Sequence, residues 1–70
     1  MNESTSRIAH QIRDRRKSLR LTQTDLAVLA GCSPRFVRAV ESGKTTVRLD
    51  KLVDLLEVVG LELTTKVRGQ

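Results

Sequence analysis

The 70-residue sequence has room for one domain with a modest core, a size at which stability often depends on a partner subunit. With one phenylalanine and no tyrosine or tryptophan, that core must be aliphatic. A net charge of +5 and a pI near 10.4 favour polyanionic partners. The positive charge is concentrated in residues 1–48, which hold ten Lys or Arg and four acids, whereas residues 49–70 hold three and four.

The residues that the sequence lacks exclude several classes of protein. The single cysteine, Cys32, allows no internal disulfide and is interpreted as a small apolar filler. One histidine, no cysteine cluster and no glycine-rich phosphate loop leave no catalytic constellation, so we expect no enzyme activity, cofactor or metal. No apolar run approaches the roughly 20 residues of a membrane span, and no signal-peptide core is present. We expect a soluble, cytoplasmic, nucleoid-associated protein without a membrane partner.

The chain is expected to begin with a flexible segment, residues 1–4, followed by an amphipathic helix over residues 5–19. At about 100° per residue, this helix has one apolar stripe, formed by Ile8, Ile12 and Leu19. Arg16 falls beside the stripe. A buried arginine must be paired, or its charged end must reach solvent.

Two short helices with a glycine turn between them are predicted next, over residues 23–30 and 34–42. Thr22 is suited to cap the first of them, and Gly31 to end it in the left-handed conformation. Ser33 followed by Pro34 marks the start of the second with a capping hydroxyl and a residue that has no N–H to lose. The expected inward face of the first is Leu26, Leu29 and Ala30, with Val28 at the surface.

The helix over residues 34–42 has two contrasting faces. One is apolar except for a single carboxylate and comprises Phe36, Val37, Val40 and Glu41. The other is small, polar or basic and comprises Arg35, Arg38, Ala39 and Ser42. A small residue between two arginines permits close approach to a surface, as a helix that reads a DNA groove requires.

A fourth helix and one strand complete the prediction. The helix, over about residues 49–59, has a broad apolar stripe and stops at Gly60. Alternation over residues 61–67 predicts a strand, with Leu61, Leu63, Thr65 and Val67 on one face. A lone strand leaves its backbone unpaired, so we expect it to pair with its copy across a two-fold axis; the alternative is a frayed tail. Residues 68–70 are expected to be flexible.

The run IAHQIRDRRKSLRLTQTDLAVLAGCSPRFVRAVESGK closely resembles the lambda-repressor-like, or Xre-type, helix-turn-helix family. The continuation TTVRLDKLVDLLEVVGLEL is similar to HipB-type antitoxins, in which a strand after the last helix pairs between subunits. The resemblance implies an all-α, four-helix DNA-binding domain over residues 5–60, with the 61–67 strand pairing across a homodimer. It also implies a structural ion pair between Arg16 and Glu41.

The same resemblance implies a set of DNA-contacting positions. Base reading falls on Pro34, Arg35, Arg38 and Ala39, with Ser33 nearby. Because proline offers only an apolar contact, Arg35 and Arg38 should carry direct readout of guanine; for Arg38 a phosphate contact is the alternative. Backbone contacts or support of the reading helix fall on Gln23, Ser42, Lys44 and Thr45.

The sequence therefore predicts a homodimeric repressor that reads a palindromic operator in double-stranded DNA. By analogy, we expect the antitoxin of a HipBA-like system, which also binds a HipA-like toxin kinase and represses their shared promoter. One alternative is a stand-alone regulator, such as a prophage repressor or a restriction-modification controller. Another, from a different class, is an interaction module without DNA binding, against which the clustered basic residues argue.

Overall fold

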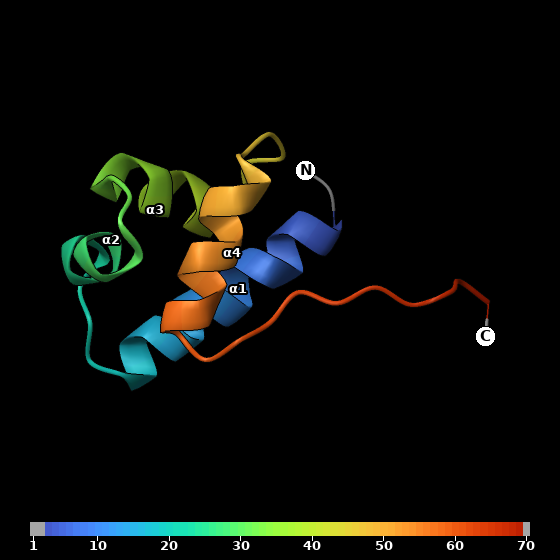
Figure 1. Ribbon diagram of the computed structural model, residues 1–70, viewed down its shortest axis with the longest axis horizontal. Coiled ribbons are helices and arrows are strands. Elements are labelled where there is room, and N and C mark those ends of the chain that lie inside the picture. The colour runs from blue at the N-terminus through green and yellow to red at the C-terminus, as the bar shows by residue number, and fades with distance from the viewer. Residues whose placement is uncertain (1–2, 70) are drawn as a thin grey trace.

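Four helices make up most of the computed structural model, which describes residues 3–69. They are α1 (Glu3–Ser18), α2 (Gln23–Ala30), α3 (Pro34–Glu41) and α4 (Leu49–Val58). α3 packs against both α1 and α2, and α2 also packs against α4; in the view of Figure 1, α4 lies in front of α1. The all-α, four-helix prediction is therefore confirmed. None of the described helices is long and apolar enough to cross a membrane.

The start of α1 corrects one expectation from the sequence. Residues 3 and 4, predicted to be flexible, are already helical, while residues 1 and 2 of that segment lie outside the described residues. Glu3 lies in the first turn, where a negative charge favours the helix dipole, and its carboxylate lies 3.5 Å from the Arg7 guanidinium one turn later. Both features favour an earlier helix start.

An aliphatic core joins all four helices. Ile12 of α1, Leu26 of α2, Val37 of α3 and Leu55 of α4 have no exposed surface. Around them lie smaller or slightly exposed buried residues, namely Ala27, Ala30, Val40, Leu52, Leu56 and Val59. Burial of this surface drives the helices together, since three of the four have only eight to ten residues and are marginal in isolation.

Two leucines predicted to face the core lie at the surface instead. Leu29 is 61% exposed, and Ala27, at 1%, takes the inward position, because α2 turns its small residues toward its neighbours and so approaches them closely. Leu19 is 44% exposed because α1 ends at Ser18, which takes Leu19 off the helical stripe. Val28, at 75%, lies at the surface as expected.

The ends of α2 and α3 follow the local sequence closely. Thr22 Oγ1 accepts the Asp25 N–H at 3.0 Å, and Asp25 Oδ2 accepts the Thr22 N–H at 2.9 Å, forming a capping box. The hydrogen bond from the Thr22 backbone lowers the pKa of Asp25. Ser33 Oγ accepts the Phe36 N–H at 3.1 Å, and Pro34 is the first helical residue, as expected.

The four helices end in the same way, but α1 uses an unfavourable residue. After α2, α3 and α4 the chain turns through a glycine with φ between 71° and 85°, whereas after α1 it turns through Arg20 at φ 59°. The Arg20 and Leu21 N–H groups bond to the Lys17 and Arg16 carbonyls, which is the Schellman pattern. A side chain in this left-handed conformation carries a steric cost that glycine avoids.

We expect Arg20→Gly to raise the free energy of unfolding by about 1 kcal/mol, because glycine adopts the left-handed conformation without that cost. Urea denaturation measures the change. Arg20→Ala is the control, since it removes the same charge but keeps Cβ, and it should give no gain. Equal stabilities for the two variants would mean that backbone strain at this position is negligible.

After α4 the chain turns once and then leaves the helices as an extended segment (Figure 1). The Leu61 N–H bonds to the Leu56 carbonyl at 2.8 Å, and Arg15 Nε donates to the Val59 carbonyl at 2.8 Å. The strand predicted over 61–67 is not formed in the single chain: residues 61–69 contain no strand, because no second extended segment within residues 3–69 pairs with them. Residue 70 lies outside the described part.

Candidate nucleic-acid interface

The turn between α2 and α3 fixes the relative orientation of the two helices. Gly31 has φ 71°, and the Cys32 N–H returns to the Ala27 carbonyl at 3.0 Å. Cys32 is half-buried against the core, and burial raises the pKa of its thiol. It fills space, as predicted. α3 then begins at Pro34 with Val37 and Val40 buried, so its opposite face is turned to solvent.

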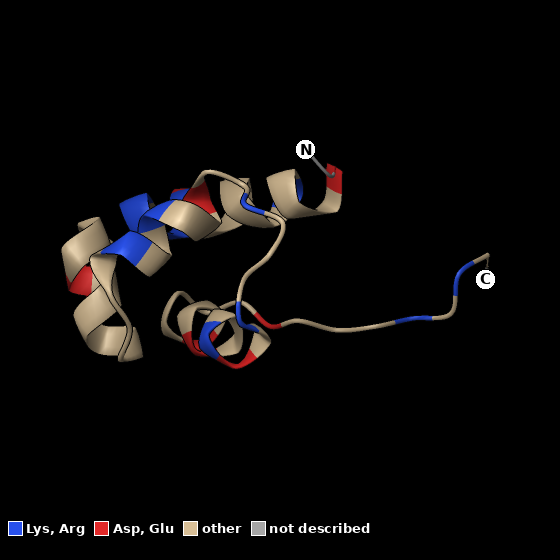
Figure 2. Cartoon of the chain, turned by 90° about the horizontal axis from the view of Figure 1, so that it is seen from above, with Lys and Arg blue, Asp and Glu red and all other residues tan. Residues whose placement is uncertain are grey.

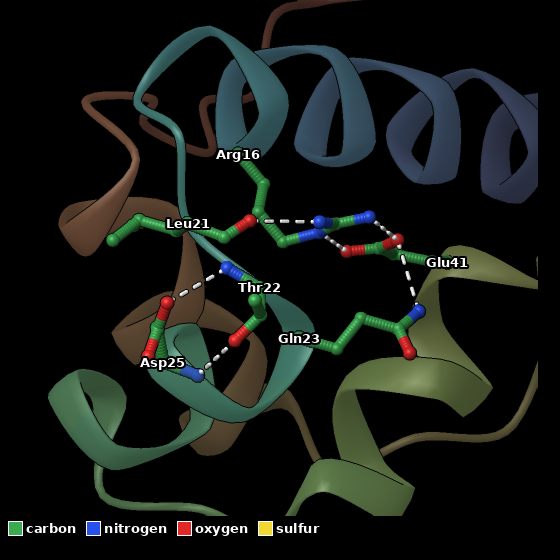
Figure 3. Close-up of polar contacts among 6 residues, drawn as sticks. All are labelled: Arg16, Leu21, Thr22, Gln23, Asp25 and Glu41. Carbon is green, nitrogen blue, oxygen red and sulfur yellow. Dashed lines mark hydrogen bonds and ion pairs between the residues drawn. The ribbon is translucent and has the colours of Figure 1, made fainter.

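An ion pair ties α1 to α3 beneath that face (Figure 3). Arg16 Nε lies 2.7 Å from Glu41 Oε2, and Arg16 Nη2 donates to Glu41 Oε1 at 3.0 Å. The remaining Arg16 nitrogen, Nη1, donates to the Leu21 carbonyl at 2.8 Å. The side chains are only 11% and 5% exposed. The pair expected from the sequence is present with two parallel hydrogen bonds, and the bond to Glu41 raises the pKa of Arg16.

Gln23 extends this network from α2. Its Nε2 donates to Glu41 Oε1 at 3.2 Å, so one carboxylate at the end of α3 holds groups from both α1 and α2 (Figure 3). Both Glu41 oxygens are thereby engaged within the protein. Of the two roles that the resemblance allowed for Gln23, this geometry supplies the support of α3.

The solvent face of α3 carries two arginines without protein partners. Arg35 and Arg38 are exposed, and within residues 3–69 neither makes an ion pair or a side-chain hydrogen bond. Ala39 lies half-buried on the same face. Ser42 Oγ donates to the Ala39 carbonyl at 2.8 Å, so its proton is already engaged. The outer face of α3 therefore carries two positive charges, left unpaired by the described residues, beside the small side chains of Ala39 and Ser42.

A hollow lies on each side of α3. The first, here called the α1 hollow, has a volume of about 370 Å³ and is lined by Arg13, Arg16, Gln23, Arg38, Glu41 and Ser42. The second, here called the loop hollow, has a volume of about 300 Å³ and is lined by Ser33, Arg35, Phe36, Ala39, Lys44, Thr46, Val47 and Arg48. α3 therefore forms a ridge between two concave surfaces that both contain arginines.

Three polar residues that line these hollows were not among the residues predicted to form the site; they are Arg13, Thr46 and Arg48. Only the packing of α1 and of the 44–48 loop against α3 brings them beside the predicted site. Lys44 lines the loop hollow as well, whereas Thr45 is exposed and lines neither hollow.

The remaining predicted site residues are divided between the helix start and the C-terminal segment. Ser33 Oγ is used as the α3 cap, and Pro34 is half-buried at the first position of the helix. Leu61 packs against the core instead of lying free. The other three residues assigned to dimerisation lie exposed in the extended segment; they are Leu63, Thr65 and Val67.

The charges are distributed by element. Lys and Arg gather along α1 and α3, whereas Asp and Glu predominate on α4 (Figure 2). The basic side is therefore the side that carries the α3 ridge and the α1 hollow. A short helix, a turn through a left-handed glycine and a second helix with a basic outer face define a helix-turn-helix unit, whose second helix enters the DNA major groove in proteins of this class.

Comparison with known proteins agrees with this geometry. Residues 12–65 match the helix-turn-helix family, and the chain belongs to that family. It is also similar to an uncharacterized HTH-type transcriptional regulator, y4mF, of Sinorhizobium fredii (strain NBRC 101917 / NGR234). The two are 33% identical over 55 residues, which cover 79% of this chain and 72% of the relative.

Proposed function

We propose that this protein is a sequence-specific DNA-binding transcriptional repressor that acts as a homodimer on a palindromic operator. The observation that carries the proposal is the α3 face, where Arg35 and Arg38 have no partner within residues 3–69 and lie on a capped helix that is held by the buried Arg16–Glu41 pair. The relative's description as a transcriptional regulator supports it. The protein catalyses no reaction and acts in the cytoplasm, at the nucleoid.

Selection from a random pool of duplex DNA tests the proposal. The enriched sequence should contain two inverted half-sites whose centres lie about one helical turn, or 10 bp, apart. Placed between a promoter and a reporter gene, it should lower expression when the protein is present. A pool that remains random after selection would leave an interaction module without DNA binding as the better description.

The dimer of this proposal forms through the C-terminal segment. Leu63 and Val67 are 46% and 70% exposed in a single chain, and they alternate with polar residues as in a strand with one covered face. Pairing with a second copy would give the extended backbone its missing hydrogen-bond partners and cover this apolar surface. Arg15, bonded to the Val59 carbonyl, holds the point from which the segment leaves.

We expect Leu63→Asp to make the protein monomeric, because it places a charge on the apolar face of the paired strand. Sedimentation equilibrium measures the state of association. Thr64→Asp is the matched control: it adds the same charge one residue later, on the opposite face, and should remain dimeric. Dimers of undiminished stability in Leu63→Asp would exclude pairing through this face.

A narrower role is that of an antitoxin in a HipBA-like system, with a HipA-like toxin kinase as second partner. The support is the similarity of the run after residue 44 to HipB-type proteins. A kinase-like reading frame directly beside the gene, and co-purification of its product with this protein, would be expected. Without such a neighbour, a stand-alone regulator is the better description.

A further inference from the structure

We infer that Arg13 of α1 and Arg38 of α3 together bind one phosphate of the DNA backbone in the α1 hollow, so that Arg38 anchors the duplex and does not read a base. This inference rests on the proposed DNA-binding function. It adds a contact from α1, which the sequence did not indicate, and it settles the role of Arg38 between the two that the sequence left open.

The charge of the α1 hollow is the first argument. Four charged residues line it, but Arg16 and Glu41 neutralise one another through two hydrogen bonds. Glu41 Oε1 also accepts from Gln23, so the charge of this carboxylate is already compensated by groups of the protein. Arg13 and Arg38 remain, two positive charges with no partner within residues 3–69. An anion in the hollow would relieve their repulsion.

The neighbours of Arg13 along α1 supply no carboxylate that could pair with it in place of a phosphate. The residues three and four positions away along α1 are Ala9, His10, Arg16 and Lys17, none of which is acidic. An exposed arginine in a surface helix commonly pairs with a carboxylate at such a position, as Arg7 does with Glu3. Arg13 instead faces the hollow beside α3.

The position of the hollow beside α3 is the second argument. At about 100° per residue, Arg38 and Glu41 lie on one flank of the outward direction of α3, and Phe36 and Ala39 on the other. Each flank adjoins its own hollow. A helix lying in the major groove has one sugar-phosphate backbone on either side. The α1 hollow then meets one backbone and the loop hollow, with Lys44 and Arg48, meets the other.

A phosphate fits the donors that are available. Two arginines from different elements line the hollow, and arginine presents paired N–H groups that match phosphate oxygens. Glu41 also lines the hollow, but its charge is compensated by Arg16. If Arg38 contacted a guanine edge in the groove, Arg13 would be left without a role, because it lies on α1 and not on the outer face of α3.

The test uses the full-length protein, an operator selected from a random pool and an unrelated duplex of equal length. For each half-site occupied, Arg13→Gln should weaken binding to both duplexes by about tenfold and reduce the slope of log K against log salt by about 1. Arg38→Gln should have the same two effects. Arg7→Gln, which removes a charge from another face of α1, should leave both measurements unchanged. Thermal unfolding of each variant verifies that the fold is intact.

Phosphates of the operator are then replaced one at a time by an uncharged methylphosphonate. At one position in each half-site, the replacement should weaken the parent protein, have a smaller effect on Arg13→Gln and on Arg38→Gln, which each keep one of the two arginines, and have no further effect on the variant that carries both changes. A titration with inorganic phosphate at constant ionic strength, monitored through the NMR signals of the arginine Nε–H groups, shows whether the hollow binds free phosphate as well as the phosphate of DNA.

Each outcome bears on one proposal. If the parent protein prefers no sequence and binds no duplex, the proposed function fails. If the parent binds its operator but Arg13→Gln has the same affinity and salt slope, only the phosphate site is wrong. A loss in Arg38→Gln confined to the operator would make Arg38 a base reader. Saturation by inorganic phosphate without any effect of Arg13→Gln on DNA would assign the hollow to free anions.

Discussion

Glu41→Ala is expected to lower the free energy of unfolding by about 3–5 kcal/mol, the usual effect of removing one partner from a buried ion pair. The alanine leaves the Arg16 guanidinium, whose side chain is 11% exposed, with only the Leu21 carbonyl as an acceptor. Gln23 loses its acceptor as well. Urea denaturation at neutral pH measures the change, which is a large fraction of the stability of a domain of this size.

A double replacement separates the net contribution of the Arg16–Glu41 pair to stability from the destabilisation caused by one unpaired buried charge. Arg16→Met combined with Glu41→Leu removes both charges and keeps apolar volume, so it should be much more stable than Glu41→Ala. The double variant should nevertheless bind DNA less well, because two bonds that set the direction of α3 are lost. If Glu41→Ala is as stable as the parent protein, the pair is not buried in solution.

The features that sequence analysis predicted well depend on residues close together in the chain. The capping hydroxyls of Thr22 and Ser33 bond to N–H groups three residues later, and Gly31 turns the chain because of its own conformational freedom. Such interactions are decided within a few residues, so the composition of the segment is sufficient to predict them. The Arg16–Glu41 pair spans 25 residues, but each member was an isolated charge on an apolar face.

The features that were missed depend on how the helices pack. The periodicity of α2 is compatible with either Leu29 or Ala27 facing the core. The neighbouring helices approach α2 closely, so the smaller residue, Ala27, is the buried one. The bond from Arg15 to the Val59 carbonyl joins residues 44 positions apart and has no signature in either segment. Arg13 entered the site in the same way, through the position of α1 beside α3. The strand predicted over 61–67 was the opposite kind of error: no segment within residues 3–69 pairs with it, and its pairing with a second chain is part of the proposed dimer.

The centre and the margins of the proposed DNA-binding surface differ in the same way. Its centre, the outer face of α3, follows from one helix and was predictable from eight residues. Its margins, the α1 hollow and the loop hollow, are assembled from separate elements. The proposed phosphate contacts therefore depend on tertiary packing, and changes in the core that move α1 should weaken binding to all sequences before they alter which sequence is preferred.

Arg35→Ala is expected to abolish the preference for the operator while leaving weak binding to any duplex. Arg35 is exposed near the start of α3 and has no partner within residues 3–69, so its guanidinium is free to meet a guanine O6 and N7. One such contact contributes about 1–3 kcal/mol of discrimination, roughly five- to 150-fold in affinity. In a dimer on two half-sites the free-energy loss counts twice.

Two further variants separate base reading by Arg35 from its charge. Arg35→Lys keeps the charge but not the paired donors, so it should retain the salt dependence of the parent and lose most of the preference. Lys44→Ala should do the reverse: it weakens all duplexes alike and lowers the salt slope. Competition of the selected operator against an unrelated duplex measures both effects. Undiminished preference in Arg35→Ala would move the reading role to other residues of α3, since Arg35 would then be no more than a source of charge.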